Sequence, residues 1–331
     1  MANLLSLFRR PKSRPGGYLL IKRWGAGFWS DVDMVVTHLL AADLMQRKPI
    51  VQWGTEGPYA NGTADTFDLY FEPVSDTLAS DLSGSIYPTN WTNSNLLDEL
   101  PFPHTGEIHE IFGGYHLCGE KGLVPKSDRL FRFLRHREED IVVVYCWQDA
   151  NRILRRSPRR RATMQDLRIE MMRDRIILKP ELQDQIATYR ATNLDGHPVM
   201  SVHLRGSDKV YENSLLNAQN EAAFALSRDW IEGDGRNLIF LATDTARYVN
   251  RWKEAFGEDR VRLQNCLRSE HETPNFLREG SDGYRNGCEV ILDTYIAAGC
   301  DRFVGNSSST VARYVAAIGQ FPPDRLHWLD Q

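Results

Sequence analysis

Short apolar segments alternate with segments of helical periodicity through the second half of this 331-residue chain. Several apolar segments are short and rich in β-branched or aromatic residues, and turn residues flank them, which is typical of buried strands. The alternation predicts a parallel sheet with helices on both faces, because parallel strands need a long crossover connection. The expected strands are Val199–His203, Asn237–Ala242, Arg260–Leu263 and Arg302–Val304, and the expected helices cover 219–230, 247–256, 287–298 and 309–318.

The first half opens with the same pattern. Gly17–Trp24 and Pro49–Trp53 are expected strands, and Trp29–Gln46 between them has helical periodicity, so the three form a Rossmann-like βαβ unit. Gly25 and Gly27 in the turn before the helix are candidate nucleotide-binding positions, although a tight turn that needs backbone freedom explains them equally well. Further elements are expected at 127–139, 140–147, 164–175 and 180–191.

The length of the chain predicts two domains, since a single core rarely exceeds roughly 250 to 300 residues. The turn-like segment 192–196 suggests a boundary that separates residues 1–194 from residues 195–331. The expected fold class is therefore α/β of the GT-B type, with two Rossmann-like, doubly wound domains that face each other across a cleft.

The composition excludes several classes of protein. A net charge of −4 argues against a partner nucleic acid, and five cysteines without a CxxC spacing indicate a reducing compartment and no metal site. No apolar run approaches the ~18 residues of a membrane span. The apolar residues 4–8 precede the basic residues 9–14, which is the reverse of a signal peptide, so a cytoplasmic protein is expected. The basic segment is either a disordered tail or a peripheral contact with the inner membrane.

Charged residues gather directly after the strand that ends at His203. Arg205, Asp208 and Lys209 follow within six residues. In open α/β sheets ligands bind beyond the carboxyl ends of the strands, so Arg205 and Lys209 are candidates to hold an anionic ligand. A solvated loop in which Arg205 pairs with Asp208 is an equally simple interpretation.

Two more polar clusters follow expected strands. Asp244 comes directly after a strand and is either a ligand for a ribose or base or the N-cap of the next helix. A turn of small polar residues opens the last expected helix, and backbone N–H groups at a helix N-terminus suit a diphosphate. The residues of this turn are Asn306, Ser307, Ser308 and Ser309.

Glu289 and Asp293 are four residues apart on one expected helix and therefore share a face. They are either solvated or positioned to hold Arg205 and Lys209 in place.

Four motifs in this order resemble those of the GDP-fucose-dependent fucosyltransferases. They are H-x-R-x-x-D-K (203–209), F-L-A-T-D (240–244), E-V-I-L-D (289–293) and V-G-N-S-S-S-T-V-A-R (304–313). The similarity is to the α1,6-fucosyltransferase and nodulation protein Z superfamily, which is related to the protein O-fucosyltransferases. It covers the last 135 residues well, while the first half matches only through its glycine turn and βαβ unit.

The resemblance implies a metal-independent transfer of L-fucose from GDP-fucose to a hydroxyl of a glycan acceptor, with inversion. The partners would be a GDP-sugar donor, bound by residues 195–331, and an oligosaccharide or other glycan acceptor, bound by residues 1–194. The family roles carried over are contact with the donor diphosphate for Arg205 and Lys209, the nucleoside for Asp244, the guanosine side for His203 and the β-phosphate for Ser307, Ser308 and Ser309. His203 is equally consistent with a core histidine.

One position departs from the family pattern. Gly206 stands where the family often has a second arginine, so another GDP-sugar or a non-catalytic nucleotide-sugar-binding protein remains an alternative. Arg285 or Arg313 would have to compensate for the missing charge. An NAD-dependent oxidoreductase is disfavoured, because the glycine turn lacks the third glycine of the dinucleotide motif.

The base that accepts the proton of the attacking hydroxyl is expected to be Glu212, with Asp31 as the weaker choice. A plain surface carboxylate is the alternative for Glu212. The aromatic residues between Tyr59 and Trp91, together with residues 113–116, are expected to face the acceptor, unless they pack in the core.

Overall fold

The computed structural model describes residues 16–23, 25, 27–89, 91–99, 131, 134–145, 149–206, 215–270 and 280–331. Over these residues the chain forms two compact units. The first unit is drawn from residues 1–26, 31–54 and 73–164, and the second from residues 27–30, 55–72 and 165–331. The division differs from a single boundary after residue 194, because residues 55–72 and 165–193 pack with the second unit.

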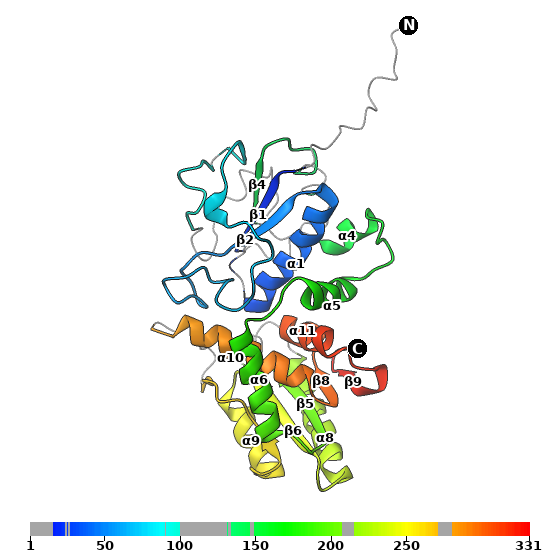
Figure 1. The fold of residues 1–331 in the computed structure, drawn as a ribbon. Coiled ribbons are helices and arrows are strands. Elements are labelled where there is room, and N and C mark those ends of the chain that lie inside the picture. Colours follow the sequence, from blue (N-terminus) through cyan, green and yellow to red (C-terminus); the bar gives the residue numbers. More distant parts are fainter. Residues whose placement is uncertain are drawn as a thin grey trace. The chain divides into compact units, whose positions relative to one another are not determined.

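The first unit holds a parallel sheet in the order β2-β1-β4-β3 (Figure 1). Its inner strand β1 is buried from Leu19 onward, and Leu20 pairs with Ile50 on one side and Val143 on the other. Helix α1 connects β1 to β2, which confirms the expected βαβ unit. The elements are β1 (Tyr18–Lys22), α1 (Phe28–Met45), β2 (Lys48–Gln52), the 3-10 helix η2 (Ala79–Asp81), β3 (Ile86–Tyr87), β4 (Ile141–Val144) and α4 (Ala150–Arg155).

The second unit holds a parallel sheet in the order β7-β6-β5-β8-β9. The chain runs outward from β5 to β7, crosses back to β8 and runs outward again, so the strand order reverses between β5 and β8. The strands are β5 (Val199–Leu204), β6 (Leu238–Thr243), β7 (Val261–Arg262), β8 (Arg302–Gly305) and β9 (Leu326–Trp328). The sequence predicts the first four of them, within two residues, and misses β9.

Helices cover both faces of this sheet (Figure 1). Alternate residues of a strand point to opposite faces. Val202 packs with Trp252 of α9 on one face, whereas the Ser201 hydroxyl donates to the carbonyl of Ala297 in α10 at 2.9 Å on the other. The helices are α5 (Met164–Asp174), α6 (Pro180–Asn193), α8 (Leu216–Gly233), α9 (Ala246–Phe256), α10 (Gly283–Ala298) and α11 (Thr310–Gly319), and the 3-10 helix η4 (Pro323–Arg325) precedes β9.

The aromatic residues of segment 55–72 belong to the core of the second unit. Tyr59 is 5% exposed and Tyr70 is fully buried, and the Tyr70 hydroxyl donates to the Tyr59 carbonyl at 2.5 Å. Phe28 packs edge-on against both rings. Trp91 in the first unit is also buried. The expectation that these aromatic rings face an acceptor is therefore wrong, and residues 113–116 lie outside the described residues.

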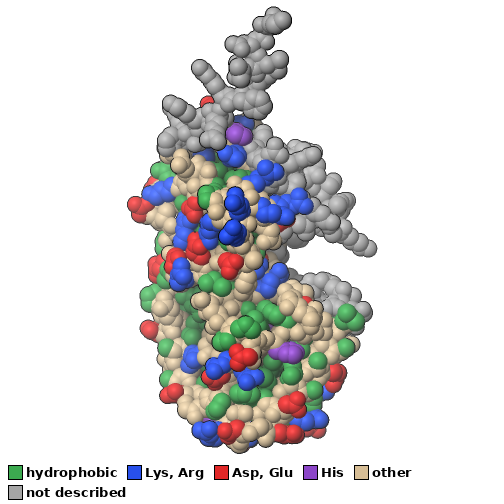
Figure 2. Space-filling view, turned by 90° about the vertical axis from the view of Figure 1, so that its right-hand side faces the viewer, with side chains coloured by type: hydrophobic (Ala, Val, Ile, Leu, Met, Phe, Trp, Pro, Cys, Tyr) green, Lys and Arg blue, Asp and Glu red, His purple; other side chains and the backbone are tan. Residues whose placement is uncertain are grey.

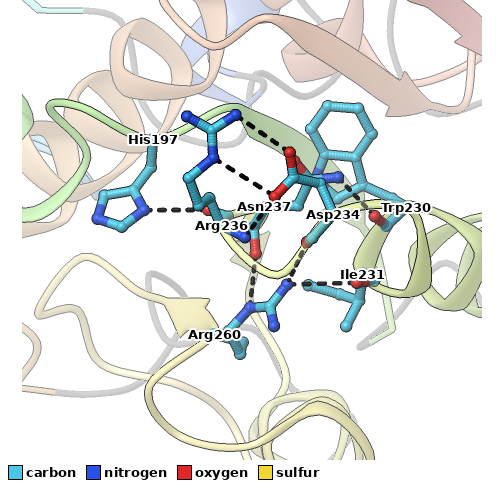
Figure 3. A network of polar contacts seen from close by, with 7 residues as sticks. All are labelled: His197, Trp230, Ile231, Asp234, Arg236, Asn237 and Arg260. Atoms are coloured by element: carbon cyan, nitrogen blue, oxygen red, sulfur yellow. Dashed lines mark hydrogen bonds and ion pairs between the residues drawn. The ribbon is translucent and has the colours of Figure 1, made fainter.

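A polar network closes the amino end of the second sheet (Figure 3). The Arg260 guanidinium donates to three carbonyl groups, those of Asn237 at 2.7 Å, Asp234 at 2.9 Å and Ile231 at 3.3 Å. Arg236 pairs with the Asp234 carboxylate at 3.1 Å. These arginines stabilise the turn between α8 and β6, so we assign them a structural role.

Basic side chains are grouped on the surface of the first unit (Figure 2). Arg155, Arg156, Arg160 and Arg161, in and after α4, are exposed. Within the described ranges, no helix is long and apolar enough to cross a membrane. The basic segment 9–14, for which a membrane contact was one expectation, lies outside the described residues.

Candidate functional site at the carboxyl edge of the second sheet

The strand order of the second sheet defines where a ligand is expected. The strand order reverses between the adjacent strands β5 and β8, and the crevice at such a switch point is the usual ligand site of an open α/β sheet. Arg205 follows β5, and the segment Asn306–Ser309, here called the serine loop, follows β8. The fold thus brings two of the predicted clusters to neighbouring strand ends.

Arg205 is held by the acid that follows the neighbouring strand β6. Its Nε lies 3.7 Å from Oδ2 of Asp244, and both side chains are about one-third exposed or less. The other carboxylate oxygen of Asp244 accepts from the Gly206 N–H at 3.2 Å and from the Thr245 hydroxyl at 2.8 Å. Asp244 therefore orients Arg205 and the Gly206 backbone, while its role at the nucleoside stays a prediction. Asp208, Lys209 and Glu212 lie outside the described residues.

Gly206 is a glycine because a neighbouring ring fills the space beside it. A β-carbon at this position would overlap Cε2 of Tyr248. The Tyr248 ring is fixed, since its hydroxyl accepts from the amide of Asn220 at 2.7 Å and from the guanidinium of Arg247 at 3.1 Å. A second arginine side chain at position 206 would thus require Tyr248 to move.

Arg247 is a cation beside Gly206 that the sequence reasoning missed. Its Nη2 donates to the Gly206 carbonyl at 3.4 Å, and the side chain is exposed in the first turn of α9. A cation in the first turn of a helix is disfavoured by the helix dipole. A basic residue just after a strand–helix junction was therefore a signal that could have identified it.

His203 is buried in β5 and is 8% exposed. Burial lowers the pKa of its imidazole to about 4, and the nearby Arg205 lowers it further than Asp244 raises it. The ring is therefore neutral at neutral pH. This environment fits the core histidine interpretation, and contact with guanosine stays a prediction.

The serine loop is held by side chains as well as by its own backbone. The Asn306 amide donates to Gln219 at 2.5 Å, and its Oδ1 accepts from the N–H and the hydroxyl of Ser308 at 2.9 and 2.5 Å. Ser309 is the N-cap of α11 and accepts from the Ala312 N–H at 3.5 Å. The loop thus presents the start of α11 at the strand edge, as the sequence predicts.

A carboxylate from beyond β9 also contacts this loop. The Oδ1 of Asp330 accepts from the Ser307 N–H at 2.7 Å, and Oδ2 accepts from the Ser308 N–H at 3.0 Å and the Ser307 hydroxyl at 3.0 Å. Asp330 was not a candidate at the sequence level, because β9 was not predicted.

The two arginines considered as substitutes for a second arginine at 206 lie in different places. Arg313 donates to the Ser308 carbonyl at 3.4 Å and the Thr310 hydroxyl at 3.3 Å, so it adjoins the serine loop. Arg285 instead pairs with Glu289 at 2.7 Å. Glu289 also accepts the Leu267 N–H at 3.1 Å, so the alternative in which it holds Arg205 is wrong.

Four buried polar atoms gather near the carboxyl end of β7 and lack a hydrogen-bond partner among the described residues. They are the Tyr189 hydroxyl, Oε1 of Gln264, Nε of Arg268 and Oδ1 of Asp293. Burial raises the pKa of Asp293 to about 7, with Glu289 acting in the same direction and Arg268 opposing. Buried polar groups are nearly always paired in folded proteins, so this cluster is suited to a polar ligand. Sequence reasoning treated Asp293 only as part of a helix face.

The glycine turn of the first unit is explained by its own backbone. Gly25 has a φ of +85°, which favours glycine, and its N–H donates to the buried Asp31 carboxylate at 3.0 Å. The Gly27 carbonyl accepts from the Ser30 N–H at 2.8 Å. The turn needs no ligand to be stable, and the roles of Gly25, Gly27 and Asp31 toward substrates stay predictions.

Solved structures with a similar fold are fucosyltransferases. The α1,6-fucosyltransferase NodZ soaked with GDP-fucose aligns with a TM-score of 0.57 and 17% identity over 92% of each chain. NodZ from Bradyrhizobium aligns with a TM-score of 0.58 and 18% identity over 91% of this chain and 92% of the NodZ chain. POFUT1 in complex with GDP aligns with a TM-score of 0.53 and 13% identity over 95% of this chain and 98% of the POFUT1 chain.

The chain has the fold of these fucosyltransferases. The resemblance seen in the sequence motifs is therefore confirmed at the level of the fold, as is the GT-B type α/β class with two parallel sheets. No known protein family matches the sequence by its profile, and no curated protein matches it.

Proposed function

We propose that this chain is a glycosyltransferase that transfers L-fucose from GDP-fucose to a hydroxyl of a glycan acceptor, with inversion and without a metal. The observation that carries the proposal is the pair formed at the switch point of the second sheet, where Arg205, oriented by Asp244, and the serine loop follow adjacent strands. The fucosyltransferase fold supports the same reaction class.

The diphosphate of the donor would bind between Arg205, the backbone N–H groups of the serine loop and the start of α11. Thr310 and Val311 are the first two helical residues, whose N–H groups have no acceptor within the helix. These N–H groups, the helix dipole and the guanidinium groups of Arg205 and Arg313 favour an anion. Negative charge grows on the diphosphate as the sugar leaves, so the same groups would lower the barrier.

The purine base would bind at the buried polar cluster. The Oδ1 of Asp293 and the side-chain carbonyl of Gln264 are acceptors, and Nε of Arg268 is a donor. A guanine offers an amino donor and the O6 acceptor, which complements this set, whereas an adenine offers no oxygen acceptor. The cluster thus favours a guanine nucleotide, as the sequence motifs predict.

The reaction needs few groups beyond these. The acceptor hydroxyl attacks the anomeric carbon on the face opposite the departing diphosphate, which inverts the configuration, and its proton passes to a base. Glu212 and Asp31 remain the candidate bases, and Lys209 a further phosphate ligand. The first unit is the proposed acceptor-binding domain. Among the described residues, no group of three or more His, Cys, Asp or Glu side chains is arranged to hold a metal ion.

Another GDP-sugar is a second candidate donor, because Gly206 replaces an arginine of the family pattern. Arg247 and Arg313 are the cations that would restore the charge. Comparing hydrolysis or transfer of GDP-fucose with that of GDP-mannose separates the two donors.

Calorimetric binding of GDP in the presence of a chelator tests the donor site. Arg205→Ala should weaken GDP binding by about 1.5 to 3 kcal/mol, or roughly one to two decades, since a charge-assisted phosphate contact is lost. The matched control is Arg236→Ala, which removes a cation at the amino end of the same sheet. A wild-type protein that prefers ADP or UDP, or that binds none of the three, would contradict the proposal.

A further inference from the structure

The Asp330 carboxylate occupies the anion-binding groups of the serine loop. It accepts two backbone N–H groups, from Ser307 at 2.7 Å and Ser308 at 3.0 Å, and one hydroxyl, from Ser307 at 3.0 Å. Successive backbone N–H groups that converge on one anion form the kind of concavity that also binds phosphate. A carboxylate of the chain itself therefore sits where the proposed function needs a phosphate to come close.

The sheet places Asp330 at this point. Gly305 of β8 pairs with Trp328 of β9, and the Leu329 N–H donates to the Gly305 carbonyl at 2.9 Å. Two residues further along each strand, Asp330 lies opposite Ser307. The parallel pairing thus delivers the carboxylate to the loop.

The Asp330 carboxylate can leave the serine loop without disturbing the rest of the fold. Its side chain is exposed, and all the hydrogen bonds described for it go to the serine loop. It lies beyond the last paired residue of β9, so rotation about the bonds of Asp330 itself is sufficient to free the carboxylate. No part of the buried core has to move.

We propose that Asp330 is an internal competitor of the donor diphosphate. It fills the serine loop when the donor is absent and leaves when phosphate oxygens approach the same N–H groups. Two anions that share one set of donors repel each other, so each weakens the other's binding. This inference rests on the proposed function, which places the diphosphate at this loop.

Competition of this kind acts on the product as well as on the donor. GDP that remains after transfer carries the phosphate charge, and the return of Asp330 to the loop favours its release. Product release limits the turnover of many enzymes. Asp330 would therefore lower the affinity for the donor and at the same time speed the release of GDP.

Asp330→Asn tests the inference, because it keeps the size of the side chain and removes its charge. The matched control is Asp234→Asn, the same change in the turn at the amino end of the sheet (Figure 3). Binding of GDP and of inorganic pyrophosphate is measured by calorimetry at low salt. Asp330→Asn should bind both about tenfold more tightly than wild type, a difference of ~1.4 kcal/mol, whereas the control should not.

The two probes separate the inference from the proposed function. If wild type binds GDP and Asp330→Asn binds it equally or more weakly, Asp330 merely braces the loop and the inference is overturned while the donor proposal stands. If neither protein binds GDP but Asp330→Asn binds pyrophosphate more tightly than wild type, the inference holds and the GDP donor is wrong. If neither probe binds either protein, both fail.

Discussion

Replacing Gly206 by alanine should destabilise the second unit, although alanine is normally harmless at such a position. The added β-carbon would overlap Cε2 of Tyr248 and lie 2.7 Å from the Thr245 hydroxyl oxygen. Tyr248 is 6% exposed and its hydroxyl is held by Asn220, so the ring cannot turn away without breaking that bond. Forcing a methyl group into a packed site costs about 1 to 3 kcal/mol, and we expect a loss in that range.

Amide hydrogen exchange of the buried strands β5 and β6 measures this loss, since it reports the opening of one unit in a two-unit chain. Gly235→Ala is the control, because a β-carbon there meets no atom within 4 Å, and it should change stability by less than about 0.5 kcal/mol. In a Tyr248→Leu background the cost of Gly206→Ala should shrink, with a coupling of about 1 kcal/mol or more. Equal costs in both backgrounds would refute the assignment of Gly206 to packing.

Two further predictions concern buried charge in the same unit. Because burial raises the pKa of Asp293 to about 7, above its ordinary value of 3.8, the folded protein holds a proton that the unfolded chain has released. Stability should therefore fall as pH rises from about 4 to about 7, and melting temperatures of Asp293→Asn should lack this slope; an unchanged slope would contradict the buried carboxyl. Arg260→Ala removes three bonds to carbonyl groups and should cost about 1.5 to 3 kcal/mol by hydrogen exchange. Its GDP affinity should equal that of wild type, and a weaker affinity would show that the amino edge is not purely structural.

Periodicity was enough to predict most of the fold. Buried strands appear in the sequence as short continuous apolar runs, whereas amphipathic helices show apolar residues with a repeat of 3.6 residues. Because the two patterns take turns along the second half, they already implied β5, β6 and β8 with their helices. The short edge strand β9 carried no such signal, because only three residues pair and none is fully buried. The helix α4 was missed for the same reason, being six residues long.

The sequence predicted those residues of the site that come directly after a strand. Arg205, Asp244 and the serine loop each come right after a buried strand, and parallel strands bring their carboxyl ends to one edge. What the sequence could not show is which of these groups contact each other. Asp244 was expected either at the nucleoside or as the N-cap of the next helix, and the structure adds its contacts with Arg205 and the Gly206 backbone, which no local pattern indicated.

The sequence by itself therefore determined the two parallel sheets and the edge at which polar residues meet, because both follow from local periodicity and strand direction. Tertiary structure alone decided the partners. Tyr248 against Gly206, Asp330 in the serine loop and Asp293 beside Arg268 join residues 22 or more positions apart. Such contacts depend on side-chain packing between separate elements, and no local pattern along the chain encodes them.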